Sequence, residues 1–311
     1  ALPTTFSHIQ NRLESNIRSK QVSTFYQSHK NSKIKLMQAA FQLLILSDNS
    51  NEKTHYTYYG RKKLKVLFSE INNSIKRWYR KKYIDQNFLQ EIIDDKPFIF
   101  LPLQQEPERS LLLGAPDYKN QIETVEYVSE CMPENFLLLV KEHPTQGSGR
   151  DWRKISQYKT LQKNPKVRLI HPSVPAAEII KKSKLVISVS GTIALESAFL
   201  DKPSITIADN DYTLIPSISR LNSKNELRGL IEKSLEKKAD PSIIMKYLDI
   251  LEENSFIFDY LKFQVSYFDH FYFGGNLVDV EISESHMKEF LVKKQNLENL
   301  AQEFKKKMIK N

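Results

Sequence analysis

The feature that most constrains the fold is an alternation, between residues 97 and 207, of short apolar runs with longer amphipathic segments. This alternation is typical of βαβ units and predicts an α/β fold built on a Rossmann-like, doubly wound parallel sheet. The expected strands are Phe98–Leu103, Phe136–Val140, Val167–Ile170, Leu185–Val189 and Ser204–Ile207. The expected helices between them are 118–131, 151–162, 175–183 and 191–200, and Asp117 is expected to cap the first of these.

The segments on either side of this central part have a different pattern of apolar residues, which predicts additional helical N- and C-terminal segments. Residues 1–95 predict a basic, mostly helical segment, with helices near 36–46 and 64–83. We therefore expect three parts, 1–95, 96–240 and 241–311, with helices in the last part and a Lys-rich amphipathic tail over 284–309.

Positive charge is concentrated at the start of the chain. Residues 1–95 hold sixteen Lys and Arg against eight Asp and Glu, whereas the remainder is nearly balanced. Such a segment favours contact with an anionic membrane, a charged glycan or nucleic acid, and a solvated basic face explains it equally well. The aromatic patch at 54–60 and the pair Trp78 and Tyr79 are interleaved with this charge. Such aromatic rings could stack on bases or lie at a membrane surface, but we expect them to pack onto neighbouring helices.

A Ser/Gly turn follows the fourth expected strand. Ser188, Ser190, Gly191 and Thr192 place small donors and backbone N–H groups before a helix, with Glu196 one turn inside. A helix N-terminus of this kind suits an anion such as phosphate, although an ordinary βα turn would look the same.

Two other strand ends carry polar groups. The first continues as Gln104-Gln105-Glu106-Pro107-Glu108, where two carboxylates could divide the roles of acid and base, or stand in solvent as a polar loop. The second continues as Lys141-Glu142-His143-Pro144, where lysine and histidine could bind phosphate oxygens, or the histidine could be structural. Because the carboxyl ends of parallel strands meet at one edge, we expect all three groups to converge there.

Other polar motifs predict structure rather than chemistry. Asp209-Asn210-Asp211 is expected to form a turn and His171-Pro172 to end a strand, so no metal site is expected. The one cysteine, Cys131, excludes an internal disulfide and favours a reducing compartment.

The order and spacing of these motifs resemble bacterial capsule and surface-polysaccharide biosynthesis proteins, the group that includes the retaining Kdo transferases. The resemblance covers residues 97–212 and rests on three stretches and a dipeptide. These are Pro102-Leu103-Gln104 through Pro107-Glu108, Val140 through Pro144, Ser188 through Ala198, and Lys202-Pro203. It implies the C-terminal-lobe type of a GT-B glycosyltransferase, which binds a nucleotide sugar between two Rossmann-like lobes.

The resemblance also implies roles for individual residues. Lys141, His143 and Pro144 would form a nucleotide-phosphate motif, and Glu196 would lie near the ribose. Ser188, Ser190, Gly191 and Thr192 would hold phosphate or the donor's carboxylate, beside Gln104. Glu106, Glu108 and His143 would be the catalytic residues.

This sequence departs from the family pattern in two places. Relatives that transfer Kdo carry an aspartate near the position of Glu108, which leaves the nucleophile and the donor sugar open. Residues 1–95 show no βαβ alternation, so an N-terminal lobe is either absent from this chain or reduced to helices.

The combined reading predicts a metal-independent glycosyltransferase that moves a sugar, CMP-Kdo being one candidate donor, onto a surface polysaccharide or its lipid-linked precursor. The alternatives are an alditol-phosphate transferase, a nucleotide-sugar epimerase, and a non-enzymatic scaffold that binds glycan or membrane. We expect no cofactor beyond the nucleotide-sugar substrate, a glycan or glycolipid acceptor, contact with an anionic membrane, and no nucleic-acid partner. The expected place is the cytoplasm, including the inner face of the cell membrane.

Overall fold

The structure is a computed structural model of the 311-residue chain. It describes residues 7, 9, 11, 33–46, 63–92, 96–106, 108–144, 146, 153–256, 258, 260–277, 280, 282–292 and 295–309. The chain divides into two compact units. The sheet unit comprises Ala1–Thr24 and Lys76–Leu251, and the helical unit comprises Phe25–Ile75 and Glu252–Asn311. The boundaries expected at residues 95 and 240 stay a prediction.

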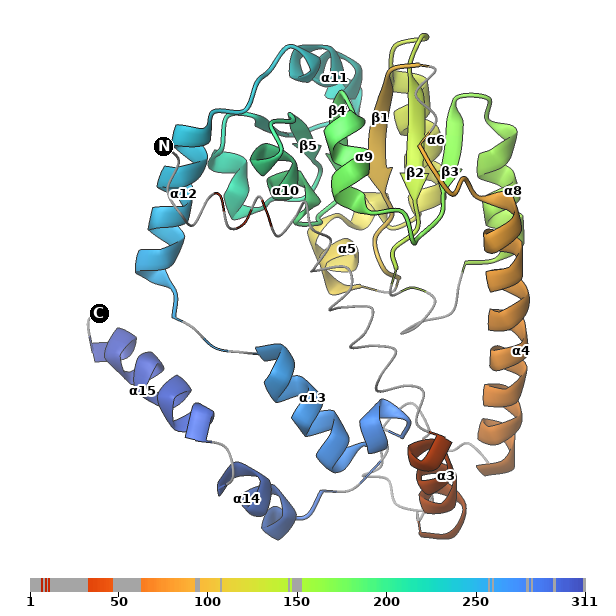
Figure 1. Cartoon of the computed structure of the whole chain (residues 1–311), viewed down its shortest axis with the longest axis vertical. Coiled ribbons are helices and arrows are strands. Elements are labelled where there is room, and N and C mark those ends of the chain that lie inside the picture. The colour runs from red at the N-terminus through yellow and green to blue at the C-terminus, as the bar shows by residue number, and fades with distance from the viewer. Residues whose placement is uncertain are drawn as a thin grey trace. The chain divides into compact units, whose positions relative to one another are not determined.

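The sheet unit is built on one six-stranded, entirely parallel sheet (Figure 1). Its strands are β1 (Phe98–Pro102), β2 (Leu137–Lys141), β3 (Val167–Ile170), β4 (Leu185–Ser188), β5 (Ser204–Thr206) and β6 (Ile218–Arg220). The strand order β3-β2-β1-β4-β5-β6 is the doubly wound order of Rossmann folds, so the predicted α/β class is confirmed. Five of the strands were expected, and β6 was not.

Four of the helices between strands lie close to the expected positions, namely α6 (Gln121–Cys131), α8 (Ile155–Lys163), α9 (Ala176–Lys182) and α10 (Ile193–Phe199). The short helix α5 (Arg109–Gly114) after β1 was not expected, and α11 (Leu227–Leu235) and α12 (Pro241–Asn254) follow β6. The expected cap at Asp117 is wrong, because that residue lies in the separate 3-10 turn η2 (Pro116–Tyr118) and Asn120 precedes α6. Helix α12 begins at Pro241, and Asp240 Oδ1 just before it accepts a hydrogen bond from Ser242 N at 2.9 Å.

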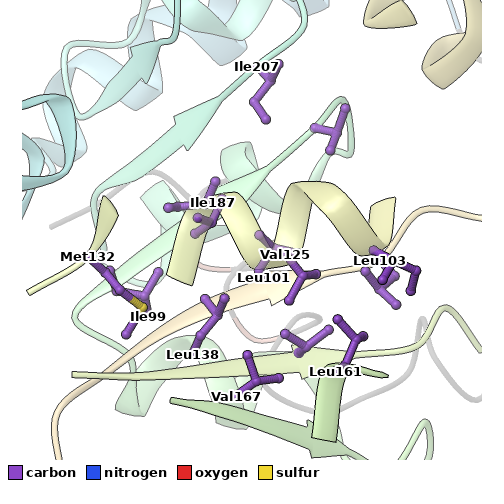
Figure 2. Packing of buried hydrophobic residues seen from close by; sticks show 14 of the residues in the cluster. Ile99, Leu101, Leu103, Val125, Met132, Leu138, Leu161, Val167, Ile187 and Ile207 are labelled. Carbon is purple, nitrogen blue, oxygen red and sulfur yellow. The ribbon is translucent and has the colours of Figure 1, made fainter. Parts of the chain in front are cut away.

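Each strand buries both faces, as a parallel sheet between helices requires. On one face Ile99, Leu138 and Ile187 pack against Val125 of α6 and Leu161 of α8 (Figure 2). On the other face Phe98, Phe100 and Val186 pack against residues of α9. Alternate residues of β1 therefore serve opposite layers, and the sheet holds its carboxyl ends in a fixed register.

The helical unit comprises α3 (Lys33–Phe41) with the π-helical turn η1 (Gln42–Leu46), and α13 (Tyr260–Phe271), η5 (Phe273–Gly275), α14 (Glu284–Val292) and α15 (Gln295–Ile309). Lys35 of α3 forms an ion pair with Asp269 of α13. Gly274 and Gly275 adopt positive φ values of 67° and 85°, which is why the chain turns after α13 there. The tail expected as a single helix over 284–309 contains α14 and α15 as separate elements.

The long helix α4 (Lys63–Asn87) joins the two units along the chain. Trp78 and Tyr79 on α4 expose 64% and 61% of their surface, so the expectation that they pack onto a neighbouring helix is wrong. The aromatic patch at 54–60 lies outside the described residues. Among the helices described, none combines the length and the apolar character needed to cross a membrane.

Candidate functional site

The polar loops converge beside the junction of β1 and β4. The chain leaves β1 toward β2 on one side and leaves β4 toward β5 on the other, so this junction is the topological switch point of the sheet. Open α/β sheets bind ligands outside the strand ends at such a point. Gln104, just after β1, donates a hydrogen bond through Nε2 to Ser188 Oγ at the end of β4, at 3.4 Å. The two loops are therefore in direct contact.

Gly191 sits where the loops approach most closely. A Cβ atom there would lie 2.9 Å from Gln104 Nε2 and 3.1 Å from Ser188 Oγ, so a side chain would displace Gln104. The Gly191 backbone N–H donates to Ser188 Oγ at 3.0 Å, and Tyr212 Oη donates to the Gly191 carbonyl at 3.0 Å. A glycine at this position lets the turn close against β1.

The remaining residues of the Ser/Gly turn differ in exposure. Within the described part of the chain, the Ser190 hydroxyl is buried and has no hydrogen-bond partner. Thr192 is exposed, and its hydroxyl donates to Glu196 Oε1 at 2.9 Å. The turn thus presents backbone and hydroxyl groups at the same edge as Gln104.

Lys141 contributes a buried positive charge next to this turn. It is the last residue of β2 and only 6% exposed. Burial lowers the pKa of Lys141 to about 8, while the carboxylate of Glu196 acts in the opposite direction. At pH 7 the side chain is therefore mostly protonated, and its charge is poorly screened by water.

A buried ion pair lies behind Lys141. The Glu142 side chain is fully buried, with its Oε2 atom 2.9 Å from Arg153 Nε. Tyr158 Oη donates to the same oxygen at 2.7 Å, and the His143 backbone N–H donates to Oε1 at 2.9 Å. Burial raises the pKa of Glu142, against the opposing effect of Arg153 and these two donors.

Arg153 also fixes the loop that follows β1. Its Nη1 atom lies 2.6 Å from Glu106 Oε2, and its Nη2 atom donates to the Gln104 carbonyl at 2.8 Å. Gln121 of α6 donates to Glu106 Oε1 at 2.6 Å, and Gln146 Oε1 accepts from the Glu106 backbone N–H at 2.8 Å. Both carboxylate oxygens of Glu106 are thus engaged.

His143 lies at the same edge with a depressed pKa. Burial, with the nearby charges of Lys141 and Arg153, lowers the pKa of His143 to about 4. At neutral pH the imidazole is uncharged, so it can exchange hydrogen bonds with a ligand but cannot neutralise phosphate. The neighbouring Pro144 is exposed.

The two carboxylates of the loop after β1 occupy different positions. Glu106 belongs to the Arg153 cluster, whereas Glu108 is half-buried at the start of α5 and makes no side-chain cap hydrogen bond there. Pro107 between them lies outside the described residues. The catalytic roles expected for Glu106, Glu108 and His143 stay predictions.

Sequence reasoning missed the groups that hold the site together, namely Arg153, Gln121, Tyr158 and Gln146. One local signal was available for their partner. Glu142 directly follows β2, one residue after the apolar run Leu137–Val140, and a carboxylate at a buried strand end needs a cation nearby. Nothing local marks Arg153 as that cation.

The other polar motifs have structural roles. Asp209 pairs with Arg220 at 2.8 Å, and Asp211 accepts hydrogen bonds from Tyr212 N and Tyr247 Oη. The turn expected over Asp209-Asn210-Asp211 lies one step later, because Asn210 is extended and Asp211 opens the 3-10 turn η3 (Asp211–Leu214). His171 ends β3 in a turn and contacts Asp85 Oδ1 of α4 at 3.1 Å. Across the residues that the structure describes, no three His, Cys, Asp or Glu side chains gather in a group that could hold a metal ion.

Comparison with known proteins shows a family and a curated relative that are similar to this chain in sequence. Residues 5–235 match the family model described as "Capsule polysaccharide biosynthesis protein". Protein FixF from Sinorhizobium fredii (strain NBRC 101917 / NGR234) is 25% identical over 137 residues, which are 43% of this chain and 32% of FixF. The chain thus spans about a third of the length of this curated relative.

Two solved structures illustrate the wider likeness. The UDP-GlcNAc 2-epimerase from Neisseria meningitidis bound to UDP-GlcNAc is 21% identical, with 57% of this chain and 48% of that chain covered and a TM-score of 0.37. KpsC from Thermosulfurimonas dismutans, a beta Kdo 2,7 transferase, is 16% identical, with coverage of 71% and 57% and a TM-score of 0.34. Likenesses this remote carry no argument about activity.

Proposed function

The chain belongs to the capsule polysaccharide biosynthesis protein family, and from this premise we propose that it is a glycosyltransferase. It would move a sugar from a nucleotide-activated donor onto a surface polysaccharide or its lipid-linked precursor. The observation that carries the proposal is the convergence of Gln104, Ser188 and Lys141 at the switch point of a Rossmann-order sheet. That is where open α/β sheets bind nucleotides.

In this proposal, Lys141 and the turn at Ser190-Gly191-Thr192 bind the phosphate of the donor. The lysine supplies positive charge in a water-poor place, and the turn supplies neutral donors. His143, uncharged at neutral pH, would hydrogen-bond a phosphate oxygen. A metal ion is not part of the proposed mechanism, because Lys141 and these donors would stabilise the leaving phosphate.

Glu108 is the carboxylate proposed to face the reacting centre, because Glu106 is held by Arg153 and Gln121. In the transfer the bond from the anomeric carbon to the donor phosphate breaks, and the acceptor hydroxyl loses its proton as the new glycosidic bond forms. Glu108 would act at the anomeric carbon or take up that proton.

The first test is a thermal-shift screen with CMP, CDP, UDP and their sugar conjugates. A ligand that binds only the folded chain raises its melting temperature. Product analysis with the best donor then distinguishes transfer from epimerisation, since an epimerase changes the donor sugar without an acceptor. If no nucleotide shifts the melting temperature, the proposal is wrong.

The second test compares His143→Ala and Glu108→Gln with the matched variants His286→Ala and Glu123→Gln, which change exposed residues elsewhere. We expect the site variants to lose at least a hundredfold in transfer rate while keeping the melting temperature within a few degrees. The matched variants should retain activity. Near-normal transfer by both site variants would show that His143 and Glu108 do not have the roles proposed for them.

A further inference from the structure

Helix α4 carries apolar side chains in solvent at helical spacing. Leu64, Phe68, Ile71, Ile75, Trp78 and Tyr79, here called the apolar stripe, each expose 58% to 69% of their surface. At about 100° per residue these positions fall within an arc of about 100° on one side of the helix. Within the described part of the chain this is an amphipathic helix whose apolar side is uncovered.

The apolar stripe is not the side by which α4 packs. Val66 and Ile84 are the buried aliphatic residues of α4, and each belongs to a hydrophobic core. They lie eighteen residues apart, which is five turns, and point about 170° away from the centre of the stripe. With respect to the residues that the structure describes, α4 therefore packs through the side of Val66 and Ile84 and exposes the opposite side.

The charge on α4 indicates what could cover that second side. The helix carries seven Lys and Arg against two acidic residues. Lys65, Lys76 and Lys82 are exposed, and the ammonium of Lys82 lies 5.8 Å from the centre of the Trp78 ring. Lysine stems beside aromatic rings are typical of helices that lie at the boundary between lipid headgroups and acyl chains.

A second copy of the chain fits this side less well. The stripe follows the 4-3 spacing of a coiled-coil seam, with Phe68 and Ile75 at one core position. The flanking positions that would form interhelical ion pairs hold Lys65, Leu67, Asn72, Ser74, Tyr79 and Lys81, and none is acidic. Two such helices would bring like charges together.

We propose that the apolar stripe of α4 binds the surface of an anionic phospholipid bilayer, with Phe68, Ile75 and Trp78 inserted below the headgroups and Lys65, Lys76 and Lys82 among the phosphates. The helix lies on the membrane and does not span it, since its charges exclude the hydrocarbon interior. This site is separate from the proposed nucleotide site and does not depend on it.

The test is co-sedimentation of the full chain with vesicles of phosphatidylglycerol and phosphatidylcholine, and with vesicles of phosphatidylcholine alone. We expect binding to the anionic vesicles that weakens with added salt, and at least tenfold weaker binding to the neutral ones. Trp78 fluorescence, measured in a Trp152→Phe background, should shift to shorter wavelength only with anionic vesicles. Absence of binding to phosphatidylglycerol vesicles would overturn the proposal.

Two triple variants and their matched controls locate the contact. Phe68→Gln/Ile75→Gln/Trp78→Gln and Lys65→Gln/Lys76→Gln/Lys82→Gln should each weaken vesicle binding at least tenfold. Leu113→Gln/Leu214→Gln/Val292→Gln and Lys159→Gln/Lys233→Gln/Lys238→Gln change exposed residues elsewhere and should bind like the parent. Equal losses in variants and controls would contradict the proposal.

Light scattering of the same proteins separates the competing occupant. The parent should show the mass of a single chain in the concentration range used for sedimentation, and so should the apolar triple variant. A parent dimer that the apolar triple variant converts to monomer would identify the stripe as a protein interface and overturn the membrane proposal.

Discussion

At the scale of single residues, Lys141 combines a stability cost with the proposed binding role. Its pKa falls from 10.5 to about 8 on burial, which corresponds to a cost of up to about 3 kcal/mol for keeping it charged in the folded state at pH 7. Lys141→Met keeps the length of the side chain and removes the charge. We expect a higher free energy of unfolding in urea at pH 7, together with at least tenfold weaker nucleotide binding.

The pH dependence of these effects has a definite sign. Because the folded-state pKa of Lys141 is lower than the unfolded one, the unfolded chain holds more protons between pH 8 and pH 10.5. The stability cost is therefore fully present below about pH 8 and is relieved as the pH rises. Nucleotide affinity should fall above about pH 8 in the parent and stay level in Lys141→Met, as measured by calorimetry. A nucleotide affinity that stays level in the parent up to pH 10 would contradict the role of Lys141. The control is Lys159→Met on the exposed side of α8, whose nucleotide affinity should change with pH as that of the parent does.

Sequence reasoning reached candidate residues at, or within three residues of, the ends of buried strands. Lys141, His143 and Gly191 were selected because apolar runs end there and the ends of parallel strands meet. Arg153 was missed because its importance comes from partners on other loops, Glu142 and Glu106, which no local pattern connects to it. The neutral state of His143 likewise follows from its neighbours in space rather than in sequence.

At the scale of elements, the guanidinium of Arg153, just before α8, binds groups in the loops after β1 and β2. Arg153→Met would leave the fully buried Glu142 carboxylate without a cation, and we expect a loss of about 3–5 kcal/mol in the free energy of unfolding. Glu106→Gln should cost only about 1 kcal/mol, because that side chain is 31% exposed and water screens the lost charge.

Urea denaturation of the two variants and of Arg153→Met/Glu142→Gln measures this difference. The double variant should recover most of the loss, since its buried amide can still accept the Tyr158 hydrogen bond and carries no charge. Equal losses in Arg153→Met and Glu106→Gln would show that the pair with Glu142 is not the one that matters.

Elements were predictable where the pattern was long enough. β1, with five apolar residues, and β2, with four apolar residues before Lys141, were found to within one residue at each end. β6 has three residues, Ile218-Ser219-Arg220, and so short a run shows no periodicity. Its strand character depends on pairing with β5, which the sequence around it does not reveal.

At the scale of the whole molecule, the cores of the sheet unit predict that residues 76–251 fold without the rest of the chain. Apart from the half-buried Ile9, every residue of its three hydrophobic clusters lies between Tyr83 and Leu248. We expect this fragment to unfold in a single cooperative transition followed by circular dichroism. Its melting temperature should rise with the nucleotide that stabilises the full chain.

A shorter fragment, 76–236, lacks α12 and exposes the side chains of β6 and α10 that Ile244 and Tyr247 cover, so it should lose cooperative unfolding. If both fragments unfold cooperatively, α12 is not part of the fold that holds the Ser/Gly turn. If the longer fragment does not fold, the sheet unit depends on residues outside 76–251 for its stability.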